Sequence, residues 1–384
     1  AMSGFFAEGD LTPNLIEQAR QRLTGYIDLT SSNPTEQGLL FPPEILAEAS
    51  AGYWTARRYR PDPFGWLPAR EAICRYYAGR TPALPLDPGQ IFIAASTSEA
   101  YSLLFALLTE PGDNILAPDV TYPLFEYLAA IHHVELRPYR LDESRGWQID
   151  PASLIEQADE RTRAVLLISP HNPTGMIVEE RQTALLELGL PVICDEVFAE
   201  FTYRAKTTPP FGALHPELPV FHLNGISKLF ALPDMKLGWI AFSGPAAQRE
   251  KYTGRLELLN DTFLSCSSLV QWMLPALFEK GWPFVESMRD YVRQNLNLAL
   301  GKLKDCLDLD IVAPPAGGYY LFPKVNRWRD EDALVLYLLE EGGVLVHPGY
   351  FYGYEGNGAH IMISALTRPE KLEEGLDRLI KALA

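Results

Sequence analysis

Cysteine is scarce in this chain. Its 384 residues include four cysteines, far apart and never in a C-x-x-C spacing, which are Cys74, Cys194, Cys266 and Cys306. This pattern indicates neither a disulfide framework nor a zinc site, so we expect reduced and mostly buried thiols. Two of the seven histidines, His132 and His133, are consecutive on a predicted helix and point apart. We therefore expect no metal site.

Positive charge is also in short supply. Lysine and arginine number 33 against 49 acidic residues, which leaves a formal net charge of −16. Nucleic acids are bound through basic stripes that face the phosphate backbone, and no run of lysine and arginine is present. We therefore expect small-molecule partners and no nucleic acid.

Long apolar runs are missing. Segments such as "AVLLIS" and "LLFALL" are far shorter than the roughly 20 residues that cross a bilayer. Residues 2–12 have neither the basic start nor the apolar centre of a signal peptide. We expect no membrane segment and a cytoplasmic location.

What the chain does contain is an alternation of strand-like and helix-like segments. "QIFIAAS" precedes "EAYSLLFALL", and "AVLLISP" precedes "EERQTALLEL". Continuous apolar strands between helical patterns predict a mostly parallel α/β sheet that is covered on both faces. After about residue 290, long amphipathic helices flank "GGYYLFPKV" and "AHIMISA". We predict a large domain over residues 46–290 and a smaller α+β domain from residues 1–45 and 291–384.

Polar side chains follow three neighbouring predicted strands. Asn172 follows "AVLLIS", Asp195 ends "PVICD", and Ser227 and Lys228 follow "VFHLNG". Taken singly, they read as a turn former, a helix cap and residues of a solvated loop. Because ligands bind outside the carboxyl ends of strands in open parallel sheets, the set predicts a binding site.

A predicted helix start supplies a possible anion site. Ser96 and Glu99 have the spacing of a capping box, and free N–H groups at a helix start favour a phosphate. The G-x-G-x-x-G loop of dinucleotide sites is absent, which disfavours NAD. A phosphate site, an acid, an amide and a lysine together suit pyridoxal phosphate, which forms a Schiff base with lysine. Desolvation would make the Lys228 amine nucleophilic.

Several motifs carry a family resemblance over nearly the whole chain. They are "SSNPTEQGLLFP", "YRPDPFG", "TSEA", "PGDNILAPDVTYPLFE", "HNPTG", "DEVF", "GISK" before "KLGW", "GGYYLFPK" and "GVLVHPG". With them the chain resembles the fold-type I, aspartate-aminotransferase-like pyridoxal-phosphate enzymes, the class I/II aminotransferases. The resemblance implies a large domain with a mostly parallel sheet of the seven-stranded type, flanked by helices, and a smaller α+β domain from both termini.

The resemblance also implies roles for individual residues. Lys228 would form the aldimine with pyridoxal 5'-phosphate and later move a proton between the substrate Cα and the cofactor. Asp195 would pair with the ring nitrogen, Asn172 would donate to the phenolic oxygen, and Tyr122 would stack on the ring.

Further carried-over residues concern the cofactor phosphate. Ser96 and Thr97 would bind it through N–H and hydroxyl groups, with Ser227 and Lys236 adding contacts. Tyr59 would reach the phosphate of the other subunit's cofactor. We therefore expect a homodimer with shared active sites.

The chain departs from the family pattern at three positions. Lys236 stands where arginine is usual, so the phosphate meets a point charge rather than a bidentate fork. Phe198 replaces a tyrosine, which leaves Asn172 alone at the phenolic oxygen and should raise the pKa of the aldimine. Met362 stands where the family has its arginine for the substrate α-carboxylate.

Several replacements for that arginine are open. Arg368 has the same parity along an extended segment. The "RRYR" loop at 57–60, or Tyr319 and Tyr320, could bind the substrate instead. A substrate without an α-carboxylate would need no replacement.

The function expected from these residues is aminotransfer through Lys228 between an amino acid or amine donor and a 2-oxo acid acceptor. Another pyridoxal-phosphate reaction on an amino acid, by a β-lyase, decarboxylase or cyclase, is the alternative that Met362 favours. A cofactor-sensing module fused to a DNA-binding regulator is disfavoured, because no basic domain precedes the motifs and the chain is acidic.

Overall fold

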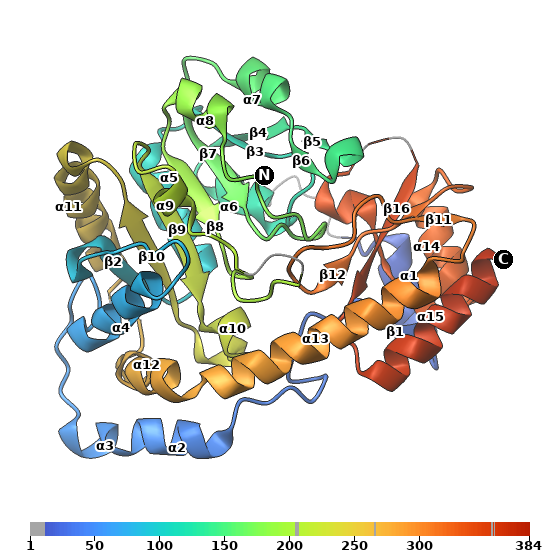
Figure 1. The fold of residues 1–384 in the computed structure, drawn as a ribbon, viewed down its shortest axis with the longest axis horizontal. Helices are drawn as coiled ribbons and strands as arrows, with labels where there is room; N and C mark the ends of the chain where they lie inside the picture. Colours follow the sequence, from blue (N-terminus) through green and yellow to red (C-terminus); the bar gives the residue numbers. More distant parts are fainter. Residues whose placement is uncertain (1–11, 204–206, 265, 355, 357) are drawn as a thin grey trace, which may run out of the picture.

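The computed structural model describes residues 12–203, 207–264, 266–354, 356 and 358–384. Figure 1 shows two lobes, with the long helix α13 (Trp282–Leu303) running along both of them. No helix within these described residues is both long enough and apolar enough to cross a lipid bilayer.

The larger lobe is built on a seven-stranded sheet. In spatial order its strands are β2 (Ile91–Ala94), β10 (Gly238–Ser243), β9 (Val220–Gly225), β8 (Val192–Asp195), β7 (Thr162–Ile168), β3 (Asn114–Pro118) and β4 (Glu135–Tyr139). β10 runs antiparallel to both of its neighbours, and all other neighbouring pairs are parallel. The predicted α/β class is therefore confirmed.

Side chains of β7 show why its apolar run has no polar face. Ala164, Leu166 and Ile168 pack into one core cluster, while Val165 and Leu167 pack into another on the opposite face. Successive side chains of a strand point to opposite faces, so both faces must be covered by apolar helices.

Helices cover the sheet in three groups. On one face lie α5 (Thr97–Leu108), α6 (Leu124–Ile131) and α11 (Ala246–Phe263); on the other lie α7 (Pro151–Gln157) and α8 (Thr183–Leu188). α4 (Leu67–Ala78) and α12 (Ser268–Lys280) share a third cluster with β2 and β10. The short elements of this lobe are α2 (Pro43–Ala51), α3 (Tyr53–Ala56), α9 (Phe211–Leu214), α10 (Ile226–Leu229), β5 (Leu141–Asp142), β6 (Gln148–Ile149), and the 3-10 turns Pro88–Gln90, Glu143–Arg145 and Pro233–Met235.

The smaller lobe combines segments from both ends of the chain. Its sheet contains β11 (Leu309–Asp310), β13 (Lys324–Val325), β16 (Ala359–Ser364), β12 (Tyr320–Leu321) and β15 (His347–Pro348), and β1 (Ile27–Asp28) pairs with β14 (Val344–Leu345). The helices are α1 (Leu15–Arg22), α14 (Glu331–Glu340) and α15 (Pro369–Leu383), with the 3-10 turn Gly349–Tyr352. Residue 290 lies inside the continuous helix α13, and the limits at 46 and 290 stay predictions.

Candidate functional site

A cavity of about 230 Å³ lies at the carboxyl ends of the parallel strands. Six residues singled out from the sequence line it, namely Thr97, Tyr122, Asn172, Asp195, Ser227 and Lys228. They come from five different strand ends, which a parallel sheet brings to one edge. Convergence of these side chains therefore follows from the topology.

Lys228 lies in α10, directly after β9, and is half-buried with its open part in the cavity. Its Nζ is 5.8 Å from the ring centre of Phe198 and 6.0 Å from that of Tyr319. The Tyr319 hydroxyl donates to the Lys228 carbonyl oxygen at 3.1 Å. Desolvation lowers the pKa of Lys228, opposed by the charge of Asp195. The neutral, nucleophilic amine is thereby favoured.

Asp195 is the last residue of β8 and is 6% exposed. Its Oδ2 accepts from the Tyr101 hydroxyl at 2.8 Å, and its Oδ1 accepts from the Val197 N–H at 3.1 Å. Burial raises the pKa of Asp195 to about 6, although both hydrogen bonds and Lys228 act to lower it. A carboxylate in such a setting gains from any cation placed against it.

Asn172 follows β7, and its Oδ1 is buried without a hydrogen-bond partner within the described part of the chain. Both ring nitrogens of the neighbouring His171, in contrast, have hydrogen-bond partners. Its Nε2 is paired with the Val120 carbonyl oxygen at 2.7 Å and its Nδ1 with the Thr174 hydroxyl at 2.8 Å. An orphaned amide oxygen at a cavity wall indicates a site that a polar ligand completes.

The start of α5 forms the end of the cavity suited to an anion. Half of the predicted capping box is present, since the N-cap Ser96 Oγ accepts from the Glu99 N–H at 3.1 Å. Glu99 Oε2 accepts from the Ala95 N–H at 2.6 Å, one residue before the N-cap, and not from the Ser96 N–H. A Cβ at Gly238 would lie 2.9 Å from the Ser96 carbonyl carbon and 3.0 Å from the Thr97 nitrogen. Only glycine allows β10 to approach the helix start this closely.

Five predicted site residues do not line this cavity. They are Ser96, whose hydroxyl caps α5; Lys236, which follows the turn Pro233–Met235; Tyr319, which is buried behind Lys228; Arg368, at the start of α15; and Tyr59. The Arg368 guanidinium donates to the Glu36 carbonyl oxygen at 3.4 Å. Tyr59 is 70% exposed, and its predicted role lies in a second subunit.

Three polar lining residues were missed from the sequence, namely Ser32, Ser98 and Tyr101, whereas Tyr320, named from the sequence among the alternative substrate-binding residues, does line the cavity. Tyr101 is one helical turn after Thr97, so helical periodicity offered a signal for it. Tyr320 is hydrogen-bonded to the Ser32 side chain, and no local sequence pattern predicts that contact. Two of the residues that differ from the family pattern are also placed. Phe198 lines the cavity, whereas Met362 is buried in β16 and pairs with His347 of β15.

Comparison with known proteins identifies the family. The model of the family described as aminotransferase class I and II matches residues 24–379. The chain belongs to the class I and II aminotransferases. The chain is 25% identical to glutamate-pyruvate aminotransferase AlaA of Haemophilus influenzae, with 93% of this chain and 90% of that protein covered. It is 29% identical to S-alkyl-thiohydroximate lyase SUR1 of Arabidopsis thaliana, with coverage of 82% and 70%.

A solved structure agrees with this membership. An alanine aminotransferase from Pyrococcus furiosus superposes with a TM-score of 0.88 at 25% identity, covering 96% of this chain and 94% of the other. The protein is thus a pyridoxal-phosphate-dependent enzyme that transfers amino groups between amino acids and 2-oxo acids. The cavity fits this cofactor, because it combines an amine, a buried carboxylate, an amide side chain and a helix start.

Proposed function

We propose that the cavity around Lys228 is the aminotransferase active site. Bound pyridoxal phosphate supplies an electron sink that weakens the bonds to the donor Cα. The Lys228 amine would hold the cofactor covalently and, when free, would accept and return the proton of the donor Cα. The half-buried position of Lys228 and its lowered pKa support this role, because the amine must be neutral to accept that proton.

The remaining lining residues orient the cofactor in this proposal. Asp195, which accepts a hydrogen bond from the Tyr101 hydroxyl, would keep the ring nitrogen protonated. Asn172, Tyr122 and Thr97 line the same cavity: the Asn172 amide N–H would donate to the phenolic oxygen, Tyr122 would cover the ring, and the N–H groups at the helix start would bind the phosphate. Ser96, Ser227 and Lys236 keep the phosphate-side roles that the family resemblance implies for them.

The donor's carboxylate needs a different anchor from the family's arginine. Lys228 is the only cationic side chain that lines the cavity within the described residues, and Met362 carries no charge. A carboxylate in an enclosed site without a cation or hydrogen bonds is strongly disfavoured. For a donor with an α-carboxylate, we therefore infer that a guanidinium from outside this set of walls supplies the anchor.

We propose that loop 57–60 of a second copy supplies it, in a homodimer with shared sites. Arg57, Arg58 and Arg60 are exposed, and in the described part of the chain their side chains form no ion pair or hydrogen bond. They flank Tyr59, whose proposed partner is the phosphate of the other subunit. Cytoplasmic location stays a prediction.

The decisive experiment treats purified enzyme with borohydride and locates the reduced cofactor by mass spectrometry. It should be attached to Lys228, and Lys228→Ala should retain no reducible link. A reducible link in that variant would show that another amine holds the cofactor.

A second experiment distinguishes aminotransfer from a lyase reaction, which the similarity to SUR1 makes the relevant alternative. With an amino donor alone, a transaminase converts its cofactor stoichiometrically to the amine form and releases one equivalent of 2-oxo acid. A lyase instead releases ammonia continuously. Continuous ammonia release from the donors that react would overturn the aminotransferase assignment of this site.

A further inference from the structure

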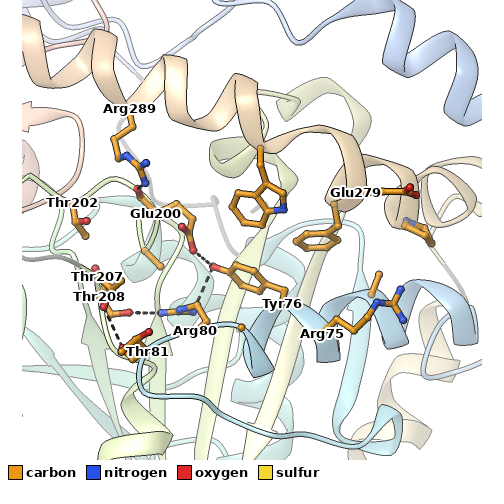
Figure 2. Close-up of a pocket in the computed structure, with 16 residues that line it drawn as sticks. Arg75, Tyr76, Arg80, Thr81, Glu200, Thr202, Thr207, Thr208, Glu279 and Arg289 are labelled. Atoms are coloured by element: carbon orange, nitrogen blue, oxygen red, sulfur yellow. Dashed lines mark hydrogen bonds between the residues drawn. The ribbon is translucent and has the colours of Figure 1, made fainter.

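A second and larger cavity, of about 660 Å³, lies between α4, the start of α13 and the segment that follows β8 (Figure 2). It shares no lining residue with the cavity at Lys228. Its volume is in the range of pockets that bind small molecules. We refer to it as the α4–α13 pocket.

Uncommitted arginines distinguish this pocket in an acidic protein. Arg75, Arg80 and Arg289 line it together with two acids, Glu200 and Glu279, although the whole chain carries a charge of −16. Arg289 contacts only the Glu200 carbonyl oxygen, at 3.4 Å, among the hydrogen bonds and ion pairs of the described residues, and the Arg75 side chain makes none there. Two cations in the wall are thus free to bind an anion.

Arg80 is not free in this way. Its Nη1 lies 3.0 Å from Glu196 Oε2, and both side chains are almost fully buried. Its Nη2 donates to the Thr208 carbonyl oxygen at 2.7 Å. Arg80 therefore shapes the pocket and holds Thr208 in place.

The Thr208 side chain provides an independent indication of a ligand. Thr208 lines the pocket and is 2% exposed, and its Oγ1 has no hydrogen-bond partner in the described chain. Buried hydroxyls without a partner are rare, because they lose their hydrogen bonds to water and gain none in the protein. Figure 2 shows Thr208 at the same end of the pocket as Thr202 and Arg289, with Arg75 at the other end.

The middle of the pocket is aromatic. The Tyr76 ring is stacked near Phe278, with centres 5.5 Å apart and planes at 30°, and near Trp282, at 6.1 Å and 20°. The Tyr76 hydroxyl is already used, since it donates to Glu200 Oε1 at 2.8 Å. These rings offer an apolar surface suited to a flat group.

We propose that the α4–α13 pocket binds a small organic carboxylate with a planar apolar body. The carboxylate lies at the end formed by Arg289, Thr202 and Thr208, and the planar body lies against Tyr76 and Trp282. The Glu200 carboxylate also lines the pocket and accepts from the Tyr76 hydroxyl, so Arg289 has to hold the anion against one like charge. The site is separate from the transaminase chemistry and does not depend on the proposed roles at Lys228.

The test is calorimetric titration of the cofactor-loaded enzyme with benzoate, compared with the neutral and isosteric benzamide. Benzoate should bind at least about tenfold more tightly, since charge-assisted hydrogen bonds to a guanidinium require the anion. Equal affinity of the two probes, or no binding of benzoate at millimolar concentration, would overturn the proposal.

Variants locate the probe. Arg289→Met should raise the Kd for benzoate by about tenfold or more. The control Arg329→Met, at an exposed position in the smaller lobe, should leave that Kd unchanged. Lys228→Ala should leave benzoate binding unchanged. Loss of binding in Lys228→Ala with retention in Arg289→Met would place benzoate in the other cavity and refute the site.

Thr208→Val distinguishes a loss of ligand binding from a loss of folding, because it keeps the side-chain volume and removes only the unpartnered hydroxyl. We expect an unchanged or higher melting temperature together with weaker benzoate binding. A lower melting temperature with unchanged benzoate affinity would mean that the hydroxyl is structural, and would contradict its role in the pocket.

Discussion

The hydrogen bond from Tyr101 to Asp195 offers a quantitative test of how the active site holds its cofactor. At 2.8 Å it reaches a carboxylate whose pKa burial has raised to about 6. A hydrogen bond to a charged group contributes about 1.5–3 kcal/mol, and one pKa unit corresponds to about 1.4 kcal/mol. Tyr101→Phe should therefore raise the pKa of Asp195 further, to about 7–8.

The consequence is a defect in cofactor binding that depends on pH. If only the carboxylate form holds the protonated ring nitrogen, a shift to about 7.5 lowers its fraction strongly at pH 6.5 and hardly at pH 8.5. The Kd for pyridoxal phosphate of Tyr101→Phe, divided by that of the unmodified enzyme, should be about 8 at pH 6.5, about 2 at pH 7.5 and near 1 at pH 8.5. Taking the ratio removes the pH dependence that Lys228 and the phosphate give to both proteins.

The assay is reconstitution of the apoenzyme, followed by the absorbance of the bound cofactor at each pH. Tyr139→Phe is the matched control. Tyr139 is equally buried, but its hydroxyl donates to the Leu166 carbonyl oxygen at 2.8 Å and not to Asp195. A Kd ratio for Tyr101→Phe that is constant with pH, or that grows as the pH rises, would refute the reasoning.

Three further predictions concern packing, charge and assembly. In urea unfolding, Gly238→Ala should lower the free energy of unfolding by about 1–3 kcal/mol, and it should weaken cofactor binding, because its Cβ would meet the start of α5. The control Gly254→Ala lies in α11 with open space around it and should be neutral or stabilising. Equal effects of the two substitutions would contradict the steric argument. Arg80→Met should cost about 3–5 kcal/mol in urea unfolding, because Glu196 would remain as a buried charge; a cost below about 1 kcal/mol would show that Glu196 finds another partner. Mixed dimers of Lys228→Ala and Arg58→Met/Arg60→Met chains should recover activity that neither homodimer has, since one site then combines an intact lysine with an intact loop; mixtures without recovery would exclude sharing of sites through loop 57–60.

Local sequence was sufficient for the parts of the site that depend on neighbours in the chain. Ser96 and Glu99 cap α5 because both contacts lie within one helical turn. Asn172, Asp195 and Lys228 could be assigned to one cavity because each follows an apolar strand, and parallel strands end at the same edge. The covered sheet itself followed from continuous apolar runs such as that of β7.

Contacts between distant segments could be decided only by the tertiary structure. Tyr101 and Asp195 are 94 positions apart, and their pairing depends on how α5 packs against β8. The Ser32 and Tyr320 pair and the contact between Arg80 and Glu196 likewise join segments far apart in the chain. Local patterns report backbone periodicity and caps, whereas the partner of a buried hydroxyl or charge is set by side chains that packing brings from elsewhere. Arg75 and Arg289 of the α4–α13 pocket belong to this second group, because only the folded chain shows which cations have no carboxylate partner among the described residues.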